Sequence, residues 1–348
     1  MVRMTSAIID ASVLATPPPG SGDEAIRRYV ASLSGWRGVV SDGLLKVYIN
    51  RRASQVLSDI GRFPDIPTLK QVLRLAGTDS PYDPITVHGV AAYLAGRALS
   101  FEDEFEIEGV LSSDEVISPD VCANLDDEKL KQELLQNLVV LAVLRSADDL
   151  CGLSLMLDCA SDISEVSVEA RIEDVEHSRN DIQVAPSMLI SAEVAAFGDF
   201  RRLLLTMLAS EIFQDSLDEK SLLSSLKVKL FQIRSESGNK PKWDKLPYNP
   251  LGHGFTETAK GYVKAGKEVD KLLRGLAETY DGIAVHKSHK LRTDKKGGSP
   301  QQIRGADGAK GMRRPIDAAC HLHYWERPDN RIEFANVTTK HDDFSMIS

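Results

Sequence analysis

A stretch rich in glycine and proline divides this chain of 348 residues into two parts of opposite charge. The stretch covers Ser235–Gly254 and contains Gly238, Pro241, Pro247, Pro250, Gly252 and Gly254. These residues interrupt helices and strands, because proline lacks a backbone N–H and glycine adopts many backbone conformations. From Leu226 onward, 23 Lys and Arg stand against 15 Asp and Glu, a net charge of +8; the first 225 residues hold 19 against 36, a net charge of −17. We therefore predict an acidic body over residues 1–234, a linker over 235–254 and a basic domain over 255–348.

The composition excludes several classes of protein. With 42% hydrophobic and 27% charged residues, the chain has the composition of a globular protein. No apolar run reaches the roughly 18 residues that a membrane span needs, so we predict no membrane partner. The four cysteines form no Cys-x-x-Cys pair, which predicts neither a zinc ribbon nor a disulfide framework and favours a cytoplasmic location. Phosphate-binding glycine loops, nucleophile elbows and zinc-protease motifs are also missing from the sequence.

Apolar spacing in the acidic body predicts a mixed α/β fold, in which short strands alternate with helices. The predicted strands are Ser6–Ile9, Leu153–Leu157 and Val166–Ile172. Three helices are predicted: one begins at Asp23, one begins at Asp126, and one covers Ser191–Phe213. The segment Phe101–Glu133 is strongly acidic, with 12 Asp and Glu against two Lys. This segment is a candidate docking surface for a protein partner.

The basic domain is predicted to have an α+β fold. Apolar residues over Phe255–Tyr280 recur at alternating spacings of four and three, which predicts one amphipathic helix of about seven turns. Gly282–Val285 is predicted to be a short strand. Two alternating runs, Ala318–Glu326 and Arg331–Thr338, are joined by turn residues and predict a β-hairpin. One helix packed on a small antiparallel sheet is the expected unit.

The stretch between the helix and the hairpin is strongly basic and glycine-rich. Nine Lys and Arg lie between His286 and Arg314, opposed only by Asp294 and Asp307. Alternation places His321, His323 and Trp325 on one face of the following strand. Cations beside histidine and aromatic side chains suit phosphate neutralisation and base stacking, which predicts RNA binding. The predicted RNA-binding residues are His286, Lys287, His289, Lys290, Arg292, Lys295, Lys296, Arg304, Lys310, Arg313, Arg314 and Trp325.

Two other interpretations of the basic stretch remain open. It is a solvated face that serves solubility alone, or it pairs with the acidic segment of the same chain, residues 102–133. The metal-binding interpretation of the histidines is weaker, because Cys320, His321 and His323 lie too close along one strand to surround a zinc ion.

Residues 250–348 resemble the RelE/ParE toxin superfamily. The resemblance rests on the long helix, the Arg313–Arg314 entry, the hairpin and the residues from Val337 to His341. It implies that Arg313 and Arg314 clamp phosphate and that His321, His323 and His341 are the candidate acid and base groups of RNA cleavage. In such a reaction the RNA 2′-hydroxyl attacks its own phosphate, so no cofactor is required. Many members end in a tyrosine where this chain has Phe344, which favours RNA binding over hydrolysis.

The opening strand, with Asp10 at its end, resembles PIN-like nucleases. That resemblance implies that Asp10 helps to hold Mg²⁺ or Mn²⁺ together with further acids, for which Asp42, Asp148, Asp149 and Asp158 are equal candidates. The alternative is that Asp10 caps a helix or turn, as aspartate often does.

Three functional hypotheses follow. The first is an RNA-binding protein of toxin or phage-defence type. In one form of this hypothesis the protein only binds RNA, and in the other it also cleaves RNA. The second is a non-catalytic nucleic-acid-binding subunit of a multiprotein defence complex. The third is a metal-dependent PIN-like nuclease. The dependence of RNA cleavage on metal separates the three.

Overall fold

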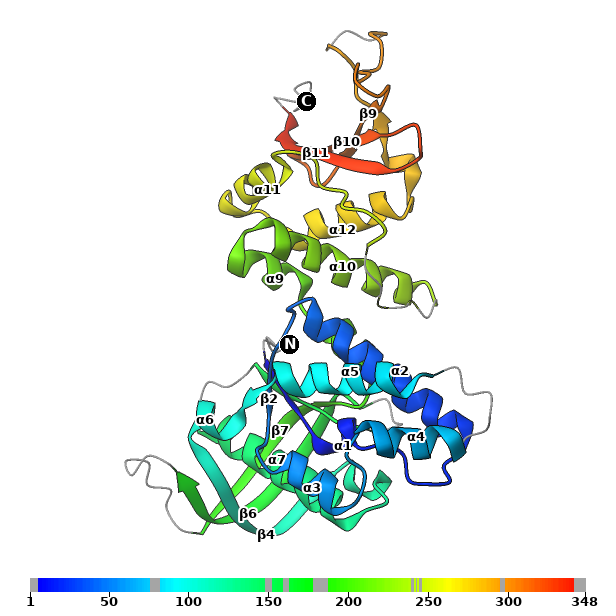
Figure 1. The fold of residues 1–348 in the computed structure, drawn as a ribbon. Helices are drawn as coiled ribbons and strands as arrows, with labels where there is room; N and C mark the ends of the chain where they lie inside the picture. Colours follow the sequence, from blue (N-terminus) through cyan, green and yellow to red (C-terminus); the bar gives the residue numbers. More distant parts are fainter. Residues whose placement is uncertain are drawn as a thin grey trace. The chain divides into compact units, whose positions relative to one another are not determined.

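The structure is a computed structural model that describes residues 6–75, 82–147, 152–158, 163–177, 187–238, 241, 243, 246–294 and 298–340. The chain divides into two compact units, Met1–Thr206 and Met207–Ser348. Both units combine helices with a sheet, so the predicted α/β class is confirmed (Figure 1). Within the described ranges, no helix is long and apolar enough to cross a membrane.

The first unit is built on a seven-stranded sheet with the order β3-β2-β1-β5-β7-β6-β4. Five neighbouring strands run parallel: β3 (Leu99–Ser100), β2 (Lys46–Ile49), β1 (Ser6–Ile9), β5 (Leu153–Met156) and β7 (Met188–Phe197). The remaining strands are β6 (Glu165–His177), which is antiparallel to β7, and β4 (Ile107–Ser118), which is antiparallel to β6. The chain builds β2 and β3 on one side of β1 and later strands on the other side, so the strand order reverses between β1 and β5.

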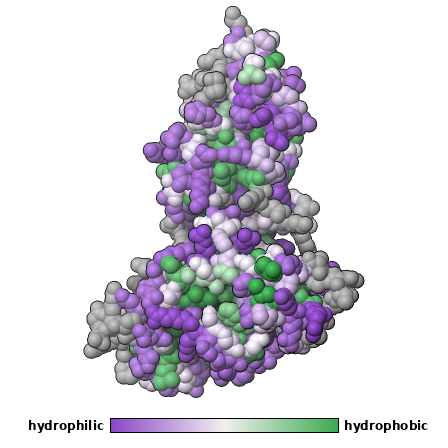
Figure 2. All heavy atoms as spheres, viewed as in Figure 1, coloured by the Kyte–Doolittle hydropathy of each residue, from purple (hydrophilic) through white to green (hydrophobic). Residues whose placement is uncertain are grey.

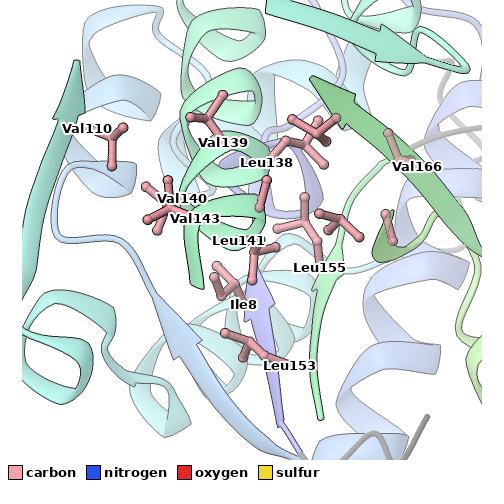
Figure 3. Packing of buried hydrophobic residues seen from close by; sticks show 14 of the residues in the cluster. Ile8, Val110, Leu138, Val139, Val140, Leu141, Val143, Leu153, Leu155 and Val166 are labelled. Carbon is pink, nitrogen blue, oxygen red and sulfur yellow. The ribbon is translucent and has the colours of Figure 1, made fainter. Parts of the chain in front are cut away.

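Helix α7 (Glu128–Ser146) packs against β4, β5, β6 and β7 and carries the largest share of this core. Figure 3 shows its side chains Leu138 and Leu141 among Ile8, Leu155 and Val166 of the strands. The predicted helix start near Asp126 is confirmed to within two residues. The helix begins here because the side chain of Asp127 caps it, accepting a hydrogen bond from the backbone N–H of Lys129.

The other helices of the unit lie between and after the strands. They are α1 (Ala11–Leu14), α2 (Asp23–Ser41), α3 (Ala53–Asp59), α4 (Ile66–Leu75), α5 (Pro84–Arg97), α6 (Phe101–Phe105), a 3-10 turn at Cys122–Asn124, and α8 (Phe200–Thr206). The predicted strands at Ser6–Ile9, Leu153–Leu157 and Val166–Ile172 and the predicted helix start at Asp23 are confirmed.

The predicted helix over Ser191–Phe213 is wrong. Strand β7 occupies Met188–Phe197, and two short helices, α8 and α9 (Ala209–Ser216), follow it. Alanine and glutamate favour a helix locally, but β7 pairs with both β5 and β6 and buries Ile190, Val194 and Ala196. Strand pairing and burial therefore override local propensity here.

The second unit contains helices α9, α10 (Glu219–Glu236), α11 (Phe255–Lys264) and α12 (Val269–Tyr280) and a four-stranded antiparallel sheet. The sheet has the order β11-β10-β9-β8, with β8 (His289–Lys290), β9 (Lys310–Pro315), β10 (Cys320–Glu326) and β11 (Ile332–Thr339). The predicted hairpin is confirmed as β10 and β11. Helices α11 and α12 pack against this hairpin, and α12 also packs against α10.

Two predictions for the second unit are wrong. The single helix over Phe255–Tyr280 is divided into α11 and α12, because Gly266 adopts a left-handed conformation with φ +70° after the last turn of α11. The predicted strand at Gly282–Val285 is a turn that leads into a 3-10 helix at Val285–Lys287. The sheet instead takes its edge strand from His289–Lys290.

Candidate nucleic-acid interface and carboxylate edge

A row of polar side chains crosses the four-stranded sheet of the second unit. His289 on β8 lies opposite Arg313 on β9, Arg313 lies opposite His323 on β10, and His323 lies opposite Asn336 on β11. Directly opposed residues on neighbouring strands point to the same face of a sheet. These four residues, called the polar row below, run from an exposed end at His289 through half-buried Arg313 to buried His323 and Asn336.

The strand register confirms the predicted alternation of β10. His321 lies opposite Pro315 and Thr338 on the same face as the polar row, and Trp325 lies on that face opposite Gly311. The opposite face of the sheet packs on the helices: the rings of Phe255 and Phe334 are 5.6 Å apart between centroids. The sheet therefore has one apolar face against α11 and α12 and one face rich in polar groups.

Exposed basic side chains lie along the β8 edge of this sheet. They are His286, Lys287, His289, Lys290 and Arg292, called the basic edge below, and all five are exposed. Arg292 donates to the backbone oxygen of Ser299 at 2.6 Å, and Lys287 lies 3.9 Å from Glu278. Lys310 on β9 is also exposed. Figure 2 shows hydrophilic side chains over much of this unit on the face in view.

The prediction that Arg314 clamps phosphate is corrected, because the structure buries its side chain away from any phosphate. Its side chain points to the helix-facing side of β9, where it is 2% exposed and forms an ion pair with Glu278 of α12. It also donates to the backbone oxygen of Ile283 at 3.1 Å. Burial lowers the pKa of this guanidinium from its usual value. Arg314 therefore holds sheet and helix together.

The predicted RNA-binding roles of Trp325 and Arg304 are also corrected. Trp325 is 5% exposed and packs with Ala309 and Ala335, so its ring offers little surface to a base. The guanidinium of Arg304 lies 5.2 Å from the centre of this ring and pairs with Asp307 and Glu333, each at 2.6 Å. The two carboxylates raise the pKa of Arg304. These contacts fix the segment before β9 onto the sheet. Lys295, Lys296 and His341 lie outside the described residues.

Two aspartates of the first unit meet at the carboxyl edge of its sheet. Asp10 follows β1 and Asp158 follows β5, and these parallel strands are neighbours. The backbone N–H of Asp158 donates to the hydroxyl oxygen of Ser12 at 3.1 Å. This edge lies where the strand order reverses, which is the position at which open α/β sheets bind ligands.

Asp10 has the environment of a structural cap. It is fully buried, its Oδ1 accepts from the backbone N–H of Ser12 at 2.9 Å, and its Oδ2 accepts from Nδ2 of Asn137 at 2.7 Å. Burial is the main cause that raises the pKa of Asp10, and the charge of Asp158 adds to it, while the hydrogen bonds lower the pKa. Burial likewise raises the pKa of Asp158.

The described residues alone do not assemble the cluster of acids that the PIN-like resemblance implies. Both oxygens of Asp10 already accept from N–H groups, and no three His, Cys, Asp or Glu side chains within the described residues converge closely enough to hold a metal. Of the other acids considered, Asp42 lies at the C-terminal end of α2, while Asp148 and Asp149 lie outside the described residues.

Glu133 and Asn137 were not among the predicted site residues, although they lie four residues apart on α7 and face the carboxyl edge. Asn137 contacts Asp10, and the charge of Asp10 contributes to the raised pKa of Glu133. A signal was present, because Glu133 and Asn137 lie at helical spacing among the apolar positions Leu130, Leu134 and Leu138 of this helix.

Comparisons with protein-family models, with curated proteins and with solved structures find no match.

Proposed function

We propose that the second unit binds RNA at the basic edge and at the accessible end of the polar row, His289 and Arg313. The observation that carries the proposal is the strand register, which continues the basic edge onto the sheet through His289 and Arg313. The lysine and arginine side chains of the basic edge are exposed, and an RNA backbone offers one phosphate per nucleotide for them to neutralise. The resemblance of residues 250–348 to RelE/ParE proteins supports RNA over DNA.

The competing interpretation is that the basic edge protects the sheet against edge-to-edge pairing with another sheet. Charged residues on an exposed edge strand prevent pairing with another sheet, and β8 is such a strand. That interpretation explains Lys287 and Lys290 but gives no reason for Arg313 and two histidines on the adjoining face. The row therefore favours binding over protection alone.

Binding is better supported than cleavage. A group that moves a proton in RNA cleavage must come within hydrogen-bond reach of the substrate. His323 is fully buried in the centre of the row, and His321 is half-buried. This agrees with the implication of Phe344 and favours the non-catalytic form of the hypothesis.

The test measures binding of labelled single-stranded RNA to the full chain, with EDTA present, over a range of salt concentrations. The variant Lys287→Gln/Lys290→Gln/Arg292→Gln is expected to bind about tenfold more weakly. It is also expected to reduce the slope of log affinity against log salt by up to about 2, because each phosphate that a cation neutralises contributes about 0.7 to that slope. The control Lys220→Gln/Lys264→Gln/Lys267→Gln removes the same charge from the helical side of the unit. Equal effects in both variants would show that net charge alone is responsible, and RNA cleavage in EDTA would establish the catalytic form.

A further inference from the structure

A groove of about 730 Å³ lies on the first unit between α3, α7 and the strands β4 and β6. Its apolar floor includes Val56, Val110 and Leu135. Charged side chains surround this floor: Arg52, Asp59, Lys129, Glu133, Asp174 and Glu176. The volume falls in the range of small-molecule sites, which combine an apolar floor with a few polar groups.

Glu133 is the unusual member of this lining. It is 3% exposed, and its Oε1 accepts no hydrogen bond from any residue that the structure describes. Its nearest cation is Arg52, at 3.7 Å from Oε2, and the Arg52 side chain is 65% exposed. A buried oxygen without a donor costs free energy, so a donor that enters the groove would relieve that cost.

The charges of the groove favour a cationic ligand. Lys129 pairs with Asp59 at 2.9 Å, and Arg52 is the partner of Glu133. Beyond these pairs, the carboxylates of Asp174 and Glu176 give the groove an excess of negative charge, and both residues are exposed. The apolar floor suits a ligand whose charged group stands on an aliphatic stem, as in the side chains of lysine and arginine.

We propose that this groove binds a small aliphatic cation, an amine or a guanidine, whose N–H groups donate to Oε1 of Glu133 while its methylene chain lies on Val56, Val110 and Leu135. Arg52, which is exposed and long, turns aside to admit the ligand. The second charged end of the ligand lies near Asp174 and Glu176.

Affinity in such a site follows the ionisation of Glu133. Burial raises the pKa of Glu133 to about 7, the charges of Asp10 and Glu102 add to the increase, and Arg52 opposes it. Asp59, Lys129, Asp174 and Glu176 are the other charged groups that line the groove. Because aliphatic amines and guanidines stay protonated through this range, affinity is expected to increase about tenfold from pH 6 to pH 8.

The experiment is calorimetric titration of the full chain with agmatine, in physiological salt, at pH 6 and pH 8. Agmatine is expected to bind and 1,5-pentanediol, which has a similar length and no charge, is not. Glu133→Gln is expected to lose at least tenfold in affinity at pH 8 and to lose the pH dependence. Glu128→Gln is the matched control, since its side chain on the same helix is 73% exposed, and it is expected to bind normally.

A second variant tests the groove without changing a buried residue, in case Glu133→Gln disturbs the fold. Asp174→Asn/Glu176→Gln changes exposed side chains only and is expected to weaken agmatine binding several-fold. Unchanged affinity in Glu133→Gln, equal binding of the diol, or an equal loss in Glu128→Gln would each overturn the proposal. Binding of an arginine-containing peptide without any binding of agmatine would overturn its small-molecule form.

Discussion

Arg314 on β9 and Glu278 on α12 form an ion pair whose side chains are 3% and 10% exposed. Glu278 also accepts from Nε of Arg274 at 2.9 Å. Removing Arg314 takes away the buried cation of Glu278 and leaves it only the more exposed Arg274 and Lys287, and breaking one side of a buried pair costs more than the pair contributes. The pair is therefore a structural requirement of the second unit.

We expect Arg314→Ala to lower the free energy of unfolding of the second unit by about 3 kcal/mol. The double variant Arg314→Met/Glu278→Leu removes both charges and is expected to recover most of this loss, because apolar replacements of similar volume leave no buried charge. Urea denaturation followed by circular dichroism measures both. A loss under about 1 kcal/mol for Arg314→Ala would contradict the structural role.

Arg313, the preceding residue, is expected to behave differently. Successive residues of a strand point to opposite faces, so Arg313 lies in the polar row while Arg314 faces the helices. Arg313→Gln is expected to lower RNA affinity about three- to tenfold and to lower stability less than Arg314→Ala does. Anisotropy titration and urea denaturation of the same preparation separate the two effects. A large loss of stability with unchanged RNA affinity would remove Arg313 from the proposed interface.

Asp10 gives a prediction about pH. Its pKa in the folded protein is raised, so folding favours the protonated form; the stability that this contributes is complete in acid and is lost as the pH rises through the folded pKa. Asp10→Asn carries no charge at any pH. Its stability relative to the native protein is therefore expected to improve from pH 4 to pH 7.

The control for this prediction is Asp10→Ala. It removes the acceptors for Ser12 and Asn137 and is expected to cost about 1–3 kcal/mol at either pH. Thermal unfolding at pH 4 and pH 7 measures both variants. Added Mg²⁺ or Mn²⁺ is expected to leave the differences unchanged, and a metal-dependent stabilisation that requires Asp10 would favour the PIN-like interpretation instead.

Local patterns in the sequence predicted the elements whose signals lie within a few residues. The β10–β11 hairpin follows from alternation and a turn, and the start of α7 follows from an aspartate cap. Strand β7 was mistaken for a helix because local propensity does not show strand pairing: β7 pairs with β6 along most of its length and with β5, about 40 residues earlier, at its end.

The candidate sites were predicted less completely for the same reason. Alternation placed His321 and His323 on one face, but the opposite orientations of Arg313 and Arg314 were not used. The burial of Trp325 depends on segments that fold back over the sheet, such as the one that carries Arg304. The groove around Glu133 joins α3, α7 and two strands, so no short stretch of sequence contains it.

The break between α11 and α12 provides a prediction that rests on backbone conformation alone. Gly266 has φ +70°, and a Cβ built on it would meet no atom within 4 Å, so the effect of a side chain there is conformational and not steric packing. Gly266→Ala is expected to lower the free energy of unfolding by about 1 kcal/mol, because non-glycine residues disfavour the left-handed region. Gly261 is the matched control. It lies inside α11 with equally open surroundings and without a positive φ, so Gly261→Ala is expected to raise the free energy of unfolding by about 0.5–1 kcal/mol. Urea denaturation of the two variants should therefore move in opposite directions. A stabilising Gly266→Ala would mean that the continuous helix predicted from the apolar spacing forms after all.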